Sequence, residues 1–160
     1  MTKPLKIVIP MAGFGSRLRP LTWSKPKPLV PLAGGTVLDQ ILNMFRSAPN
    51  FEQSEFVFIL GSTMGEQIRD HVARHYPNFH VDFAVQPEMK GQSDAFWQAR
   101  EFLHGPMLMA FSDTLIDNDF SFLARETQGV AFVKPVPDPR RFGVAEVDRN
   151  HQVIRLIEKP

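Results

Sequence analysis

Two kinds of segment alternate along the chain: short apolar runs typical of strands, and stretches whose apolar residues recur every three or four positions, as on one face of a helix. The helical pattern is clearest after Thr36, where Asp39 completes a Thr-x-x-Asp capping box in front of an apolar face. In chain order, we predict a strand at 6–9, a helix at 37–45, then alternating strands and helices at 55–60, 68–76, 79–86, 93–103 and 107–111, and further strands at 129–136, 142–147 and 153–157.

The order of these elements predicts an α/β fold. Alternating strands and helices imply a mostly parallel sheet with helices on both faces, which is a Rossmann-like three-layer arrangement. The last two strands flank Asp148-Arg149-Asn150-His151 and predict an antiparallel hairpin toward the C-terminus. A chain of this length can bury one hydrophobic core, and we interpret residues 1–160 as one domain.

Three polar motifs follow predicted strands. Gly13, Gln86 and Asp113 each come directly after such a strand or close to its end. In open parallel sheets, ligands bind beyond the carboxyl ends of the strands. We therefore expect these motifs, although distant in sequence, to meet in one crevice.

The segment at 10–31, PMAGFGSRLRPLTWSKPKPLVP, has the features of a polyphosphate-binding loop. Gly13 and Gly15 follow the first strand, and glycines in such a turn expose backbone N–H groups and let an anion approach closely. No Asp or Glu precedes Asp39, so no carboxylate offsets the positive charge of the segment. Its four cations are Arg17, Arg19, Lys25 and Lys27.

Two other phosphate-binding loops fit this segment less well. A P-loop requires four residues between its glycines, followed by Gly-Lys-Ser/Thr, and that spacing is absent. A dinucleotide-binding loop requires a third small residue where Leu18 stands. Asp39 lies about where such a fold places the acid that binds ribose, so an NAD-binding fold stays open as a minor alternative.

The same segment resembles the signature of the sugar-1-phosphate nucleotidyltransferases, also called NDP-sugar pyrophosphorylases, which reads roughly GxGxRLxPLTxxxPKPxxP. In this chain the pattern starts at Gly13, contains Arg17 and Pro26-Lys27-Pro28, and ends at Pro31. The resemblance implies a nucleotidyltransferase domain, closest to the glucose-1-phosphate thymidylyltransferase-like and uridylyltransferase-like members.

A second segment extends the resemblance to base recognition. Gln86-Pro87-Glu88 followed by Lys90-Gly91-Gln92 resembles the part of the family in which a Gln pairs with the edge of a pyrimidine and a Gly keeps the pocket thin. Without the resemblance, Gln86 would be a surface residue at a strand end, and Ser93 or Asp94 would cap the next helix. The nucleoside triphosphate site that the resemblance implies consists of Ala12, Gly13, Gly15, Ser16, Arg17, Gln86 and Gly91.

Three later segments resemble the metal and sugar elements of the family. Ser112-Asp113 resembles a Gly-Asp pair whose Asp binds Mg²⁺, with Ser here in place of Gly. A single carboxylate suits Mg²⁺, which keeps phosphate oxygens and waters as its other ligands, although Asp113 could also simply begin a turn. Phe142-Gly143-Val144 and Glu158-Lys159-Pro160 resemble the elements that contact the sugar and its phosphate. The resemblance thus implies a sugar-phosphate site made by Gly143, Glu158 and Lys159, and a metal ligand at Asp113.

The reaction that the resemblance implies is attack by a sugar 1-phosphate on the α-phosphorus of a nucleoside triphosphate, with release of pyrophosphate. We expect glucose 1-phosphate and dTTP or UTP as substrates. A phosphate monoester has a second pKa of about 6, so the nucleophile is already an anion and no general base is needed. Arg17 and Lys27 would then act catalytically by positioning the phosphates and neutralising their charge. Two alternatives stay open: a choline-phosphate cytidylyltransferase-like enzyme, and a non-catalytic subunit that senses nucleotide sugars.

Relatives in this family continue well past the Glu-Lys-Pro element and supply a second metal-binding Asp there. This chain ends at Pro160, directly after a strand-like segment. We therefore expect the sequence to be cut inside a longer protein, and this piece to be poorly active by itself.

The composition narrows the classes of partner. With 18 basic and 17 acidic residues, the chain lacks the broad basic excess that extended nucleic-acid binding needs. The absence of cysteine fits a reducing, cytoplasmic location, and the N-terminal apolar run is too short for a membrane span. A homo-oligomer is compatible with these features. His71 and His75 have a spacing that can bind zinc but lack an evident third ligand, so we expect them on a solvated helix face.

Overall fold

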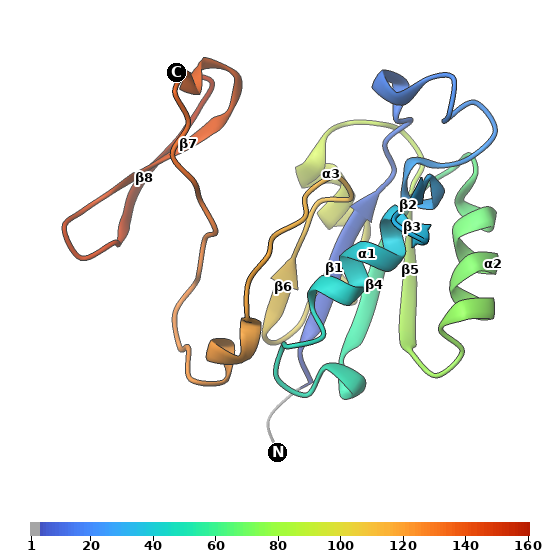
Figure 1. Cartoon of the computed structure of the whole chain (residues 1–160), viewed down its shortest axis with the longest axis horizontal. Helices are drawn as coiled ribbons and strands as arrows, with labels where there is room; N and C mark the ends of the chain where they lie inside the picture. The colour runs from blue at the N-terminus through green and yellow to red at the C-terminus, as the bar shows by residue number, and fades with distance from the viewer. Residues whose placement is uncertain (1–3) are drawn as a thin grey trace. The chain divides into compact units, whose positions relative to one another are not determined.

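The computed structural model describes residues 4–160, which divide into two compact units, one ending at Arg125 and the other formed by Glu126–Pro160. The first unit is built on four parallel strands in the order β5-β4-β1-β6 (Figure 1). These strands are β1 (Lys6–Met11), β4 (Glu55–Gly61), β5 (His80–Gln86) and β6 (Met107–Met109). The interpretation of residues 1–160 as one domain stays a prediction.

Three α-helices belong to this unit: α1 (Val37–Met44), α2 (Gly65–His75) and α3 (Gln92–Gln98). They cover both faces of the sheet. Successive side chains of a strand point to opposite faces, so the core contacts of neighbouring residues show which helix covers which face. Ile7 and Ile9 of β1 are buried with the apolar residues of α1 and α2. Val8, which lies between them in sequence, is buried on the other face with Ala95 of α3. The predicted three-layer α/β fold is therefore confirmed.

Short elements complete the two units. The first unit also contains a ribbon of β2 (Pro31–Leu32) and β3 (Gly35–Thr36), and the 3₁₀ helices η1 (Ser16–Leu18), η2 (Lys27–Leu29), η3 (Phe51–Gln53) and η4 (Phe120–Ala124). The second unit contains η5 (Pro139–Arg141) and an antiparallel hairpin of β7 (Gly143–Val147) and β8 (Val153–Glu158). The Asp148 carboxylate accepts the backbone N–H groups of Asn150 and Gln152 in the hairpin turn, so the predicted hairpin is confirmed.

Three predicted elements differ from the structure. The helix expected at 93–103 ends at Gln98, because the N–H groups of Phe102 and Leu103 bond to carbonyls three residues earlier, in the tighter 3₁₀ manner. The strand expected at 107–111 ends at Met109. The strand expected at 129–136 is wrong, since this segment pairs with no strand within residues 4–160. Alternating apolar residues form a strand only where a neighbour satisfies their backbone groups.

Asp39 connects α1 to α2 through a partly buried polar network. It forms the predicted capping box with Thr36, which is confirmed. Its Oδ1 atom also accepts the Tyr76 hydroxyl at 2.7 Å and lies 2.9 Å from His71 Nε2. Burial raises the pKa of Asp39, but hydrogen bonds from Tyr76, His71 and Thr36 outweigh it and lower the pKa to about 2. His71 is buried, so the expectation of a solvated face is wrong for this residue and holds only for the exposed His75.

Replacing Tyr76 by phenylalanine should lower the free energy of unfolding near pH 7 by about 1.5–3 kcal/mol, the usual contribution of a hydrogen bond to a charged group. The ring packing on Phe79 is kept. Because the pKa of Asp39 is lower in the folded state, its stabilisation is present above about pH 4 and is lost as the pH falls toward about 2. Urea denaturation at several pH values tests this. A wild-type-to-variant difference that did not shrink between about pH 5 and pH 3 would contradict it.

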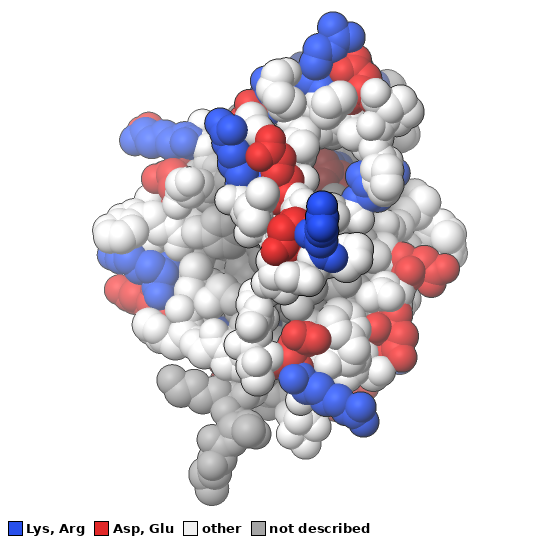
Figure 2. All heavy atoms as spheres, turned by 90° about the vertical axis from the view of Figure 1, so that its left-hand side faces the viewer, with Lys and Arg blue, Asp and Glu red and all other residues white. Residues whose placement is uncertain are grey.

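The face of the molecule in Figure 2 carries Lys and Arg side chains interspersed with Asp and Glu. They do not gather there into a patch of one sign, as expected from nearly equal numbers of basic and acidic residues in the sequence. Among residues 4–160, no helix is long and apolar enough to cross a membrane.

Candidate active site

A cavity of about 790 Å³ lies at the carboxyl ends of β1 and β6 in the first unit. The strand order reverses there, since β4 and β5 lie on one side of β1 and β6 on the other, and open α/β sheets bind ligands at such a point. The volume is in the range of small-molecule sites. The lining includes Ala12, Gly13, Gly15, Ser16, Arg17, Gln86 and Gly91, together with Lys27 and Asp113. The residues of the predicted nucleotide site thus lie together.

The glycine turn after β1 is fixed by local contacts. Gly15 has a φ of +60°, and a Cβ atom there would lie 3.0 Å from Thr22 Cγ2 and 3.1 Å from Lys27 Cβ. The Thr22 hydroxyl donates to the Gly15 carbonyl at 2.8 Å. A Cβ atom at Gly13 would meet no atom within 4 Å. Thr22 and Lys27 therefore pack against the turn at Gly15, while the space beside Gly13 is open to a ligand.

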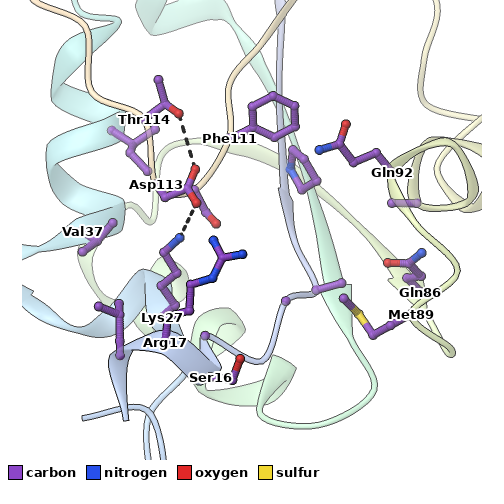
Figure 3. Close-up of a pocket in the computed structure, with 18 of the residues that line it drawn as sticks. Ser16, Arg17, Lys27, Val37, Gln86, Met89, Gln92, Phe111, Asp113 and Thr114 are labelled. Atoms are coloured by element: carbon purple, nitrogen blue, oxygen red, sulfur yellow. Dashed lines mark hydrogen bonds and ion pairs between the residues drawn. The ribbon is translucent and has the colours of Figure 1, made fainter. Parts of the chain in front are cut away.

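Lys27 and Asp113 meet in the cavity although they lie 86 positions apart in the chain. Lys27 Nζ donates to Asp113 Oδ2 at 2.7 Å, and the Thr114 hydroxyl lies 3.4 Å from Oδ1 (Figure 3). The hydrogen bond from Lys27 lowers the pKa of Asp113 and outweighs the opposing effect of burial. The Asp113 side chain is 60% exposed, against 20% for Lys27. The carboxylate therefore stays accessible from the cavity.

Arg17 adds a second cation to this side of the cavity. It belongs to η1 and is exposed, and like Lys27 it lines the cavity (Figure 3). Within residues 4–160, the structure shows no hydrogen bond or ion pair that engages this guanidinium. A guanidinium without a protein acceptor can donate in parallel to two oxygens of a phosphate.

Gln86 lies on the opposite side of the cavity, with Met89 and Gln92 (Figure 3). Its side chain is buried at the end of β5, which excludes the alternative of a surface residue. Gln86 Nε2 donates to the Gly91 carbonyl at 3.0 Å and to Asp94 Oδ2 at 2.8 Å. Asp94 therefore does not cap α3, whose N-cap is Gly91 without a side-chain hydrogen bond. Gly91 has a φ of +98° and open space where a Cβ would stand.

Sequence reasoning missed part of the cavity wall. Gly61, at the end of β4, does not line the cavity but lies directly behind it, because a Cβ atom there would be 2.9 Å from the carbonyl oxygen of the lining residue Ala12. The only signal in the sequence is a glycine at a strand end, and its meaning depends on the β1–β4 register. Sequence analysis gave no site role to the larger apolar residues of the lining, which are Leu18, Leu32, Val37, Ile41, Met89, Phe111 and Leu115.

The three predicted sugar-phosphate residues lie together in the second unit. Gly143 is paired with Glu158 in the β7–β8 register, and a Cβ atom on Gly143 would lie 3.3 Å from Glu158 Oε2. The Lys159 backbone N–H donates to the Phe142 carbonyl, and Lys159 Nζ lies 3.4 Å from Glu158 Oε1. The hairpin therefore joins two segments that sequence analysis assigned to one site. Their role in sugar binding stays a prediction.

The donor groups in the cavity fit a magnesium ion held by a single protein carboxylate. Asp113 is the acidic residue of the lining, and among residues 4–160 no three His, Asp or Glu side chains are arranged to enclose a metal. Mg²⁺ commonly binds through one or two carboxylates and completes its shell with phosphate oxygens and water. Because Lys27 bonds to the same carboxylate, such an ion would have to share the carboxylate with Lys27 or displace Lys27 from it.

The fold and cavity together define an α/β domain with a cavity lined by Arg17, Lys27 and Asp113 at its topological switch point. A family model described as nucleotidyl transferase matches residues 6–160. The chain therefore belongs to the nucleotidyl transferase family, and the resemblance noted in the sequence is confirmed.

Known relatives and structures agree with this assignment. The chain is 31% identical to the bifunctional protein GlmU of Methanococcus vannielii over 96% of its own length, and 29% identical to the low-salt glycan biosynthesis nucleotidyltransferase Agl11 of Haloferax volcanii over 98%. It spans 35% of the former and 45% of the latter.

Two solved structures share the fold. A Bacillus anthracis protein assigned as a glucose-1-phosphate thymidylyltransferase, in complex with a sucrose, superposes with a TM-score of 0.78 at 21% identity, covering 98% of this chain and 65% of that protein. A UDP-glucose pyrophosphorylase in complex with UDP-glucose superposes with a TM-score of 0.72 at 15% identity, covering 99% of this chain and 70% of that protein.

Proposed function

We propose that this chain supplies the nucleotide site of a sugar-phosphate nucleotidyltransferase, which joins a sugar 1-phosphate to a pyrimidine nucleoside triphosphate and releases pyrophosphate. The observation that carries the proposal is the cavity lined by Arg17, Lys27 and Asp113 together with the glycine turn, with open space beside Gly13. Two cations beside one carboxylate suit a polyphosphate that arrives with a divalent ion. A neutral ligand would leave the Arg17 guanidinium unmatched.

In this mechanism the protein positions anions and neutralises their charge. The backbone N–H groups of the glycine turn and the guanidinium of Arg17 hold the triphosphate, while Lys27 turns from Asp113 to the pyrophosphate that leaves. Bound Mg²⁺, held through Asp113, would supply further neutralisation of the phosphate oxygens. The phosphate oxygen of the sugar 1-phosphate attacks the α-phosphorus, and the bond from that phosphorus to the β-phosphate oxygen breaks. No proton has to be removed from the nucleophile.

We infer glucose 1-phosphate as the sugar substrate and dTTP or UTP as the nucleotide. This inference is supported by two structural relatives whose names contain glucose-1-phosphate thymidylyltransferase and UDP-glucose pyrophosphorylase. Glu158 and Lys159 would hold the sugar and its phosphate, beside Gly143. The cytoplasmic location and a homo-oligomeric state remain predictions.

A substrate screen tests the proposal. Binding of dTTP, UTP, CTP, GTP and ATP with Mg²⁺ is measured by calorimetry, and pyrophosphate release is then followed with glucose 1-phosphate, other sugar phosphates and choline phosphate. Binding of a pyrimidine triphosphate and release dependent on a sugar phosphate are expected. Activity with choline phosphate and CTP alone would instead indicate the cytidylyltransferase alternative. Binding of nucleotide sugars without turnover in any combination would indicate a sensor.

Replacing Arg17 by alanine should weaken triphosphate binding by about 1.5–3 kcal/mol, the range for hydrogen bonds to charged groups, which is roughly 10- to 150-fold in Kd. Calorimetry with dTTP or UTP and Mg²⁺ measures the change. Arg19→Ala is a matched control, because Arg19 is also an exposed arginine of this segment but does not line the cavity. Equal affinities of Arg17→Ala and the wild type would remove Arg17 from the site.

A further inference from the structure

The amide group of Gln86 can adopt only one orientation among its neighbours. Its nitrogen faces the Gly91 carbonyl oxygen at 3.0 Å and the Asp94 carboxylate oxygen at 2.8 Å. A carbonyl and an ionised carboxylate can only accept hydrogen bonds, whereas the two ends of a glutamine amide differ, one being a donor and the other an acceptor. A flip of the amide would place its oxygen against two acceptor oxygens, so the nitrogen has to stay where it is.

Asp94 is the acceptor that a substitution can remove, because the other acceptor is the backbone carbonyl of Gly91. The Asp94 side chain is itself held, since Gln98 Nε2 lies 3.3 Å from its second oxygen, Oδ1, one turn along α3. Asp94 and Gln98 are both only partly exposed. The carboxylate is therefore fixed on one face of a helix and aimed at the nitrogen of Gln86.

The Gln86 oxygen, Oε1, is left for a ligand. In Figure 3 it lies on the cavity side of the amide and the nitrogen on the side of α3. Within residues 4–160, the structure shows no hydrogen bond to this oxygen. Every fully buried side-chain oxygen or nitrogen in the same residues has a hydrogen-bond partner, so an oxygen without one must be accessible. Gln86 Oε1 is therefore in reach of the cavity. It offers a hydrogen-bond acceptor and no donor.

We propose that Asp94 is a positioning residue that fixes the Gln86 amide and thereby makes the site select uracil or thymine over cytosine. Uracil and thymine carry an N3–H donor that matches Oε1. Cytosine has an unprotonated N3 at the same place, and two acceptors would face each other. The inference rests on the proposed function, because it requires that the base of a nucleotide reaches Gln86. It also disfavours a CTP-dependent reaction.

The decisive variant is Asp94→Asn. An asparagine amide can present either oxygen or nitrogen to Gln86, so only the Gly91 carbonyl still opposes a turn. The Gln86 amide can then turn more easily and offer its N–H₂ group to cytosine N3. The Kd values of UTP and CTP are measured by calorimetry at one Mg²⁺ concentration. Wild type should bind UTP more tightly, and the ratio of the two Kd values should change by at least about 10-fold in the variant, which is the expected scale for one mismatched polar contact. If Asp94 had only a structural role, the substitution would weaken the binding of UTP and CTP by the same factor.

Two further variants make the result specific. Asp70→Asn makes the same chemical change at an exposed position of α2, away from the cavity, and should leave the ratio unaltered. Gln86→Ala removes the amide and should bring the ratio of the UTP and CTP Kd values close to one. If Gln86→Ala lowers the ratio and a folded Asp94→Asn does not, the proposal is overturned and Gln86 still reads the base. If neither variant changes it, the base is read elsewhere and the proposal also fails. If wild type binds no nucleotide, the proposed function itself is refuted.

The native protein offers a second measurement in case Asp94→Asn does not fold. The side-chain N–H₂ protons of Gln86 are already donated to Gly91 and Asp94. Their exchange with solvent, followed by NMR, should be slow and should stay slow when UTP is added. Loss of this protection on binding of UTP would show that the amide has turned, and would overturn the proposal.

Discussion

Replacing Asp113 by asparagine is expected to lower nucleotidyl transfer at least about 100-fold, since the loss of a group that only supports a metal ligand already costs about 10- to 100-fold. Asparagine keeps the shape of the side chain but removes the charge that attracts Mg²⁺. The rate of pyrophosphate release, measured over a range of Mg²⁺ concentrations, should lose most of its dependence on the metal. Nucleotide binding measured with and without Mg²⁺ provides a second readout that does not require turnover.

The fold should survive this substitution. The ion pair of Asp113 with Lys27 involves a carboxylate that is 60% exposed, and such pairs usually contribute only about 0–1 kcal/mol to stability. Asp117→Asn is the matched control, since Asp117 is exposed a few residues further on and does not line the cavity. Unfolding of Asp113→Asn would show that the residue is structural, and an unaltered response to Mg²⁺ would exclude it as the metal ligand.

Replacing Lys27 by methionine should slow turnover by about 100- to 1000-fold, or roughly 2.7–4 kcal/mol in activation free energy, which is typical when one preorganised charge-stabilising group is lost. The Kd of the triphosphate should change much less, because the contact of Lys27 strengthens only as negative charge develops on the departing pyrophosphate. Methionine keeps the unbranched part of the Lys27 side chain in η2 and removes only its charged end.

Single-turnover rates and equilibrium binding separate the two effects of Lys27→Met. Lys25→Met serves as the control, because Lys25 belongs to the same cationic segment but is exposed outside the cavity lining. A change in KM alone, with kcat preserved, would assign Lys27 to substrate binding and contradict a role in the transition state.

The sequence predicts the layers of the fold well because the central strands are buried on both faces. Ile7, Val8 and Ile9 are all fully buried, and such a continuous apolar run has few alternatives to an interior strand. Residues 129–136 show the limit of this reasoning. Their alternation resembles that of a strand, but a strand also requires a partner, and pairing is a property of the tertiary structure.

The candidate site was predictable to the extent that topology determines it. Gly13, Gln86 and Asp113 follow strand ends, so a parallel sheet brings them to one edge. The contacts within the site were not predictable from spacing. Asp94 stands where a helix cap is common, and only the structure shows that its carboxylate binds the Gln86 amide instead. The pairing of Lys27 with Asp113 depends in the same way on how two distant loops approach each other.

The Lys27–Asp113 ion pair also affects how a polyanion reaches the protein. The two charges of this pair largely cancel at long range, so the field that attracts an approaching nucleotide comes mainly from the exposed Arg17 and its neighbours Arg19 and Lys25. Encounter and transfer then depend on different side chains, with Arg17 taking part in encounter and binding and Lys27 acting on the bound phosphates. The association rate should be set by cations that salt screens efficiently, whereas the attraction of Lys27 acts at short range, after the phosphates have separated it from its carboxylate.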